Sequence, residues 1–216
     1  MAAIESAIEP LRPLDETGIA VAVRELAAID PDLAGIAERH GPPPLWGREP
    51  GFETLVRIIL EQQISLASAE AAFGRLVQAT GVVEPAAIVD AGEEGLRAAG
   101  HTRQKSRYLV GLARDVLEGR LDVDAVAAAG DDDARTMLTS VVGIGRWSAD
   151  IYLLMALLRP DVWPTGDLAL AGSMRRAKGM ATLPTGPEQA AVAEAWRPWR
   201  AVAARLLWHA YLAGER

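Results

Sequence analysis

Apolar residues recur along the chain at the three-to-four-residue spacing of helices, and stretches in which apolar and polar residues alternate are nearly absent. Proline and glycine supply the breaks, and Gly41-Pro42-Pro43-Pro44 predicts an extended link. The pattern therefore predicts an all-α fold, with helices over residues 18–29, 32–39, 102–118, 132–158 (interrupted near Gly143), 187–196 and 198–213, and others between 81 and 100 and after Gly166.

One segment is apolar over too wide a face for a surface helix. It begins at Phe52 and reads FETLVRIILEQQISLASAEAAFGRLV. Leu55, Val56, Ile58 and Ile59 lie on more than one side of such a helix. We expect a single buried central helix here.

Composition narrows the chemistry. The 216 residues are half apolar and 24% charged, enough for one compact unit or two small lobes that share a core. The chain has no cysteine, which excludes disulfides, thiolate zinc sites, iron–sulfur clusters and cysteine nucleophiles. The start lacks the pattern of a signal peptide, and no apolar run approaches the roughly 18 residues of a membrane span. We expect a cytoplasmic protein with no membrane partner.

The charge is unevenly distributed. The net charge is −7, yet residues 1–100 carry 7 basic and 16 acidic side chains, and residues 101–216 carry 15 and 13. Because the Debye length is only about 8–10 Å, a basic surface in the second half can still meet phosphates.

A glycine turn interrupts the helical pattern between residues 132 and 158. Leu138-x-x-Val141-x-Gly143-Ile144-Gly145 opens directly into Arg146-Trp147-Ser148. Glycines let backbone N–H groups approach a ligand closely, and the next helix adds partial positive charge at its N-terminus. This hairpin can grip a phosphate; a plain contact between two helices is the alternative.

The hairpin resembles the helix-hairpin-helix of the base-excision DNA glycosylase superfamily. The loop at 162–170 (VWPTGDLAL) resembles the glycine- and proline-rich loop that follows the hairpin in this superfamily. Three further stretches resemble its 3-methyladenine DNA glycosylase II branch: 60–65 (LEQQIS), 100–105 (GHTRQK) and 193–200 (AEAWRPWR), and all the matches run in order over roughly residues 50–212. The resemblance implies a two-lobed helical fold with a DNA cleft between the lobes. Residues 51–165 would form a bundle that ends in the hairpin, and residues 1–50 would pair with 166–216.

The resemblance identifies Asp167 as the catalytic carboxylate that faces the sugar of the flipped nucleotide. Its position before Leu168-Ala169-Leu170 also suits a helix N-cap, and the two roles are compatible. Because an alkylated purine is already cationic, it leaves without a second carboxylic acid. Asp150 and Asp161 are expected to be solvated.

The resemblance also implies a base pocket with aromatic walls. In the last helix Trp208 lies about 180° from the apolar stripe, so it needs another surface. The resemblance implies that this tryptophan stacks on the flipped base, with packing between the lobes as its alternative role. Trp147, Trp163 and Tyr152 are the other candidates, with core packing as the alternative for the tryptophans. Where relatives have a tyrosine one turn after the hairpin tryptophan, this chain has Ile151.

Two segments are expected to contact DNA: the hairpin, through Gly143, Ile144, Gly145, Arg146 and Ser148, and the run Gln62, Gln63, Ile64 and Ser65. Gln63 is the candidate to fill the gap left by the flipped nucleotide, and hydrogen bonding at a helix end is its alternative role. The basic residues of 102–114 are interpreted as a solvated helix face.

No cofactor is expected to be required. His40, His101 and His209 lack metal-ligand spacing. The resemblance implies an alkali ion on the hairpin carbonyls of Thr139, Val141 and Ile144.

The expected function is hydrolytic excision of alkylated bases from damaged double-stranded DNA by a monomeric enzyme. Trp147 stands where bifunctional relatives carry a Schiff-base lysine, so hydrolysis without strand cleavage is expected. A non-catalytic lesion-binding protein and a glycosylase for uracil or oxidised bases are the alternatives.

Overall fold

The computed structural model describes residues 12–214, and every regular element in that range is helical, as the hydrophobic pattern predicts. No helix in this range is both long and apolar enough to span a bilayer. The chain divides into two compact units. Unit 1 contains residues 12–45, Leu158–Trp163 and 168–214, and unit 2 contains Trp46–Leu157 and Pro164–Asp167.

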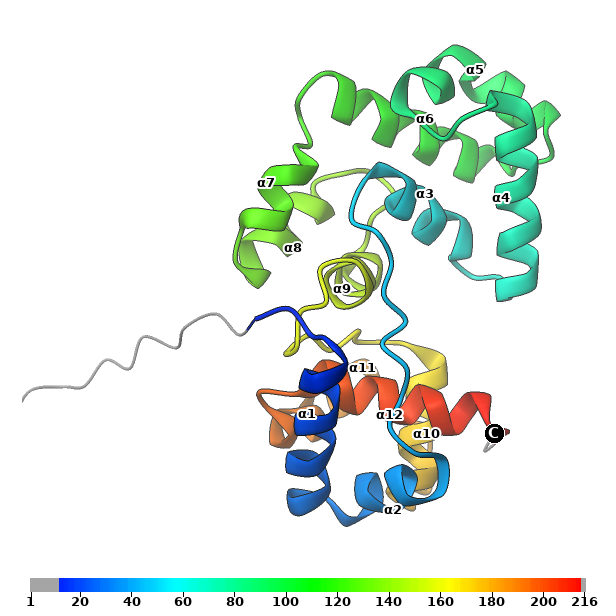
Figure 1. Cartoon of the computed structure of the whole chain (residues 1–216). Helices are drawn as coiled ribbons and strands as arrows, with labels where there is room; N and C mark the ends of the chain where they lie inside the picture. Colours follow the sequence, from blue (N-terminus) through cyan, green and yellow to red (C-terminus); the bar gives the residue numbers. More distant parts are fainter. Residues whose placement is uncertain (1–11, 215–216) are drawn as a thin grey trace, which may run out of the picture. The chain divides into compact units, whose positions relative to one another are not determined.

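Unit 2 contains seven helices: α3 Phe52–Glu61, α4 Leu66–Thr80, α5 Pro85–Ala98, α6 Arg103–Leu117, α7 Val123–Ala128, α8 Asp131–Thr139 and α9 Arg146–Met155 (Figure 1). Its core is built on the apolar side of α3, where Leu55, Val56, Ile58, Ile59 and Leu60 are at most 1% exposed.

Unit 1 contains α1 Glu16–Ile29, α2 Pro31–His40, α10 Leu168–Ala177, α11 Gly186–Ala193, the 3₁₀ turn η1 Glu194–Trp196 and α12 Arg200–Leu212 (Figure 1). The helix α12 begins at Arg200 rather than at Pro198 as the sequence suggested. Nine of the thirteen residues of α12 are buried, including Arg205, whose side chain donates to the carbonyls of Leu45 and Ala201.

The single central helix expected from Phe52 is wrong, because the segment forms α3 and α4 with a break at residues 62–65. Gln63 has a φ of +60°, which no helix accommodates. Ser65 caps the second helix, since its hydroxyl accepts a hydrogen bond from the N–H of Ser68. Apolar spacing continues through this break, so periodicity alone does not reveal it.

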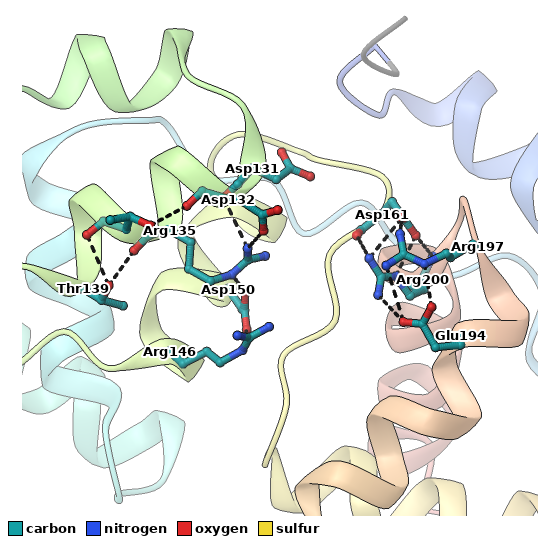
Figure 2. Close-up of polar contacts among 11 residues, drawn as sticks. Asp131, Asp132, Arg135, Thr139, Arg146, Asp150, Asp161, Glu194, Arg197 and Arg200 are labelled. Atoms are coloured by element: carbon teal, nitrogen blue, oxygen red, sulfur yellow. Dashed lines mark hydrogen bonds and ion pairs between the residues drawn. The ribbon is translucent and has the colours of Figure 1, made fainter. Parts of the chain in front are cut away.

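The residues between α9 and α10 are shared by the two units. Leu158–Trp163 belongs to unit 1, whereas the sequence placed it with the hairpin bundle. Asp161 explains this assignment, because it forms ion pairs with Arg197 and Arg200, which also contact Glu194 (Figure 2). Asp161 is only 16% exposed, so the expectation of a solvated charge is wrong for this residue.

Asp30 is the buried polar centre of unit 1. Its carboxylate caps α2 and accepts hydrogen bonds from Lys178 Nζ at 2.6 Å and Trp196 Nε1 at 2.7 Å. Burial alone would raise the pKa of Asp30, but these hydrogen bonds outweigh it and lower the pKa below its ordinary value. One side chain thereby joins α2, η1 and the residue that follows α10.

Candidate functional site

The glycine hairpin forms between α8 and α9 as predicted. The N–H of Val141 donates to Leu138 O at 3.2 Å, and the N–H of Ile144 donates to Val141 O at 3.0 Å. Gly145 then occupies the N-cap position of α9, and no side chain caps that helix. The N–H groups of the first turn of α9 are therefore open to an anionic ligand.

The two hairpin glycines serve different purposes. Gly143 has a φ of +101°, and a Cβ there would lie 2.4 Å from Cγ of Tyr108, so the fold itself requires glycine. Gly145 has an ordinary φ of −87°, and a Cβ there would meet nothing within 4 Å. Packing therefore does not require glycine at position 145. Glycine there leaves the space in front of the α9 N-terminus empty.

A buried ion pair braces the hairpin from inside (Figure 2). Arg135 of α8 donates from Nε to Oδ1 of Asp150 on α9 at 2.7 Å. Arg146 Nε lies 3.6 Å from Oδ2 of the same carboxylate, and Arg135 also pairs with the exposed Asp132. Asp150 is fully buried, so the expectation that it is solvated is wrong: the side of α9 opposite the apolar stripe packs on α8.

Gln62 connects the end of α3 to the hairpin. Its Nε2 donates to Gly143 O at 2.8 Å and to Ser148 Oγ at 2.9 Å. Ser148 and Ile144 are only 3% and 4% exposed, and their expected contact with DNA stays a prediction. These three residues shape the hairpin.

The loop after α3 is held at its base and exposed at its tip. Lys105 Nζ donates to Leu60 O, and Arg48 forms two hydrogen-bonded contacts of about 3 Å with the Glu61 carboxylate. Burial lowers the pKa of Lys105. Beyond this base, Gln63 is exposed in the left-handed backbone region and Ile64 is 41% exposed.

Asp167 lies at the end of a turn in which its N–H donates to Pro164 O at 3.3 Å. Its carboxylate Oδ2 accepts a hydrogen bond of 3.0 Å from the indole Nε1 of Trp147, in the first turn of α9. Both side chains are partly exposed. The fold thus brings together a carboxylate and an aromatic ring that are 20 residues apart in sequence, directly beside the open end of α9.

The decisive comparison concerns most of the chain: residues 56–200 match the family model of the HhH-GPD superfamily of base excision DNA repair proteins. The chain belongs to this superfamily. The matched region contains the hairpin, the loop after α3 and Asp167.

Relatives in this superfamily have names that agree with one another. The DNA-3-methyladenine glycosylase of Bacillus subtilis is 30% identical over 85% of this chain and 65% of its own. The solved 3-methyladenine DNA glycosylase of Schizosaccharomyces pombe, in complex with abasic DNA, is 25% identical with a TM-score of 0.83, covering 91% of this chain and 98% of that one. A DNA-3-methyladenine glycosidase from Bacillus halodurans is 30% identical with a TM-score of 0.76, covering 88% of each chain. The chain spans 64% and 65% of the length of two Bacillus subtilis relatives.

Two of the four aromatic residues predicted for the base pocket lie in cores instead. Tyr152 is fully buried, and its hydroxyl accepts a hydrogen bond from the N–H of Gly51 at 2.9 Å. Burial raises the pKa of this phenol. Trp163 is 4% exposed, and its ring centroid lies 5.5 Å from that of Trp196 within unit 1. Neither ring has surface to offer a base, because both fill the interior of their own unit.

Trp208 is 8% exposed, so its predicted position off the packed surface of the last helix is wrong. The angular argument assumed that α12 has one buried side, whereas Arg205, Leu206, Leu207 and Trp208 in succession are all buried. Stacking of Trp208 on a base stays a prediction.

Sequence reasoning missed several residues that hold the site together, chiefly Tyr108, Lys105 and Arg135. Each acts through a contact between helices that no motif announces. One available signal was Gly143, since a glycine in a tight turn often marks a close neighbour. Within residues 12–214, no group of three or more His, Asp and Glu side chains is arranged to hold a metal ion.

Proposed function

We propose that this protein is a monofunctional DNA glycosylase that hydrolyses the N-glycosidic bond of alkylated bases, of the 3-methyladenine type, in double-stranded DNA. Superfamily membership and the names of the relatives support this assignment. The observation that carries it is the hydrogen bond between Trp147 and Asp167 beside the uncapped N-terminus of α9. It combines a carboxylate, an aromatic surface and a phosphate site within one part of unit 2.

In the proposed mechanism, the first turn of α9 binds a backbone phosphate, and the damaged nucleotide rotates out of the duplex. The bond between C1′ and the base nitrogen breaks, and the cationic base leaves as a neutral molecule with the bonding electrons. Positive charge develops on the sugar. A carboxylate about 4 Å away stabilises it by roughly 4 kcal/mol at an effective dielectric constant near 20, about a thousandfold in rate. Water then adds to C1′ and releases a proton, which leaves an abasic site.

Asp167 supplies this charge, and Trp147 fixes the direction of the carboxylate through Nε1. The indole of Trp147 stacks on the extruded base. Trp147 stands where a Schiff-base lysine would be needed, so the enzyme hydrolyses without cutting the strand. Borohydride is expected to trap no covalent adduct with DNA, and a trapped adduct would contradict the assignment.

The exposed loop after α3 supplies the group that fills the vacated space. Gln63 is our candidate, because its side chain is exposed on a loop whose base is fixed by Lys105 and Gln62. Gln63→Ala should flip the damaged nucleotide more slowly. The rate can be measured with a methylated duplex that carries a fluorescent base opposite the lesion.

No cofactor is needed for this chemistry. The carbonyls of Thr139, Val141 and Ile144 are candidates for an alkali ion, since the Val141 carbonyl that accepts from Ile144 keeps a second lone pair. Such an ion would add positive charge at the phosphate site. The enzyme works as a monomer, and because its substrate is chromosomal DNA, its place is the cytoplasm beside that DNA.

The test replaces Asp167 by asparagine, which is nearly isosteric and removes the negative charge. Single-turnover excision of a methylated purine should fall by about two to three orders of magnitude, while the melting temperature and the affinity for abasic DNA hold. Asp133→Asn is the matched control, since it removes the same charge from an exposed position on α8.

Excision by Asp167→Asn within a few-fold of the unmodified protein would refute the mechanism. A panel of lesions with one preparation separates the alternatives. Release of uracil or oxidised bases without release of methylated purines would assign the enzyme a different substrate. Binding of damaged DNA without release of any base would show a non-catalytic protein.

A further inference from the structure

The helix α6 presents an aromatic residue directly to the hairpin. The side chain of Tyr108 lies so close to Gly143 that a Cβ on the glycine would be within 3 Å of its Cβ, Cγ and Cδ2 atoms. The hydroxyl of Tyr108 accepts a hydrogen bond from Gln104 Nε2 at 2.9 Å. Its own proton therefore remains to be donated to another acceptor.

A cation lies beside this ring. The guanidinium carbon of Arg107 is 5.4 Å from the centroid of Tyr108, and the side chain is exposed. Arg107 forms no ion pair with any residue that the structure describes. Three other arginines of unit 2 are differently placed: Arg48, Arg57 and Arg120 each pair with glutamate or aspartate.

The sequence around Arg107 contains no acidic residue. The twenty residues from Gly95 to Arg114 include five basic side chains and no acidic one, in a chain of net charge −7. Burial lowers the pKa of the neighbouring His101, and the positive charges of Arg75 and Lys105 lower it further. The cations around Arg107 lie next to the uncapped N-terminus of α9. Together they form a local positive surface that can bind a polyanion although the whole chain is acidic.

We infer that the DNA-binding surface of unit 2 extends from the hairpin onto α6, where Arg107 and the hydroxyl of Tyr108 bind a backbone phosphate beside the one held by α9. Contact with Tyr108 limits the motion of the guanidinium before DNA arrives, which lowers the entropic cost of binding. Tyr108 packs directly against Gly143, and this packing fixes the position of the proposed α6 phosphate contact relative to the hairpin contact. This inference rests on the proposed function only in that the ligand is duplex DNA.

The test measures affinity for a duplex that contains a stable abasic-site analogue, by fluorescence anisotropy over a series of salt concentrations. Arg107→Gln should weaken binding several-fold near 0.1 M salt and make the slope of log K against log salt shallower by about 0.9. Arg114→Gln is the matched control, because it removes the same charge from an exposed residue of the same helix about 10 Å further along its axis. It should leave the slope unchanged. Tyr108→Phe, which keeps the ring against Gly143, should weaken binding by a smaller factor and retain the slope.

Equal slopes for Arg107→Gln and Arg114→Gln would overturn the inference, since the arginine would then contribute only general charge. Unaltered affinity in both Arg107→Gln and Tyr108→Phe would overturn it as well. The assay involves no chemistry, so it is independent of excision. If the unmodified protein releases no methylated base but Arg107→Gln still loses its phosphate contact, the proposed function fails and the inference stands.

Discussion

Replacing each hairpin glycine by a residue with a side chain should separate folding from DNA binding. Gly143→Ala places a Cβ 2.4 Å from Cγ of Tyr108 and forces alanine to a φ of +101°. Gly145→Val places a Cβ that meets nothing within 4 Å, at a φ of −87° that valine adopts readily. The two substitutions lie two residues apart and change the same turn.

The magnitudes follow from this geometry. At Gly143 the backbone strain costs about 1–3 kcal/mol, and overpacking against Tyr108 adds about 1–3 kcal/mol. At Gly145 the loss is about 1 kcal/mol or less, the difference between glycine and valine at an N-cap. DNA affinity shows the reverse contrast. The valine blocks N–H groups of α9 that would each contribute about 1.5–3 kcal/mol to a charged phosphate, so affinity should fall tenfold or more.

Urea unfolding measures the first effect, and anisotropy with an abasic duplex measures the second. Gly145→Val should bind more weakly with nearly the same salt slope, because backbone N–H groups carry no net charge to exchange for counterions. The reasoning is refuted if Gly145→Val binds DNA as the unmodified protein does. It is also refuted if Gly143→Ala is as stable as Gly145→Val.

Three further results are expected. Trp147→Phe keeps an aromatic ring but removes the donor to Asp167, so single-turnover excision should fall about five- to tenfold; an unchanged rate would show that the indole does not position the carboxylate. Asp150→Ala leaves the largely buried Arg135 with the exposed Asp132 as its ion-pair partner and should cost about 3 kcal/mol in urea unfolding, and a loss below about 1 kcal/mol would contradict a stabilising pair. Asp30 has a lowered pKa in the folded state, so its contribution is present above pH 4 and lost as the pH falls through the folded pKa. The stability difference between the unmodified protein and Asp30→Asn should therefore narrow below about pH 4, and a constant difference down to pH 2 would contradict the shift.

The helical class and the hairpin could be predicted from sequence because both depend on local signals. Apolar spacing repeats every three to four residues, and proline and glycine end the repeats. The hairpin follows from two glycines at a fixed spacing before a helix, and Asp167 followed from a motif resemblance. Such features need only neighbours in the chain.

The arrangement of side chains around the hairpin needed the tertiary structure. Asp150 looked like a solvated charge because its partner, Arg135, lies on another helix. Trp208 looked free of the core because periodicity predicts one buried side, and α12 is buried around its circumference. The break after Glu61 escaped notice because apolar spacing runs through it.

The sequence by itself determined that this chain is helical, lacks thiol chemistry and carries a glycine hairpin ahead of an aspartate. Only the fold decided which residues meet there: Trp147 on Asp167, Gln62 on the hairpin carbonyl and Tyr108 on Gly143. The physical reason is distance along the chain. Local backbone preferences act over a few residues, whereas these contacts join residues 20 to 81 apart that come together only when the core of unit 2 packs.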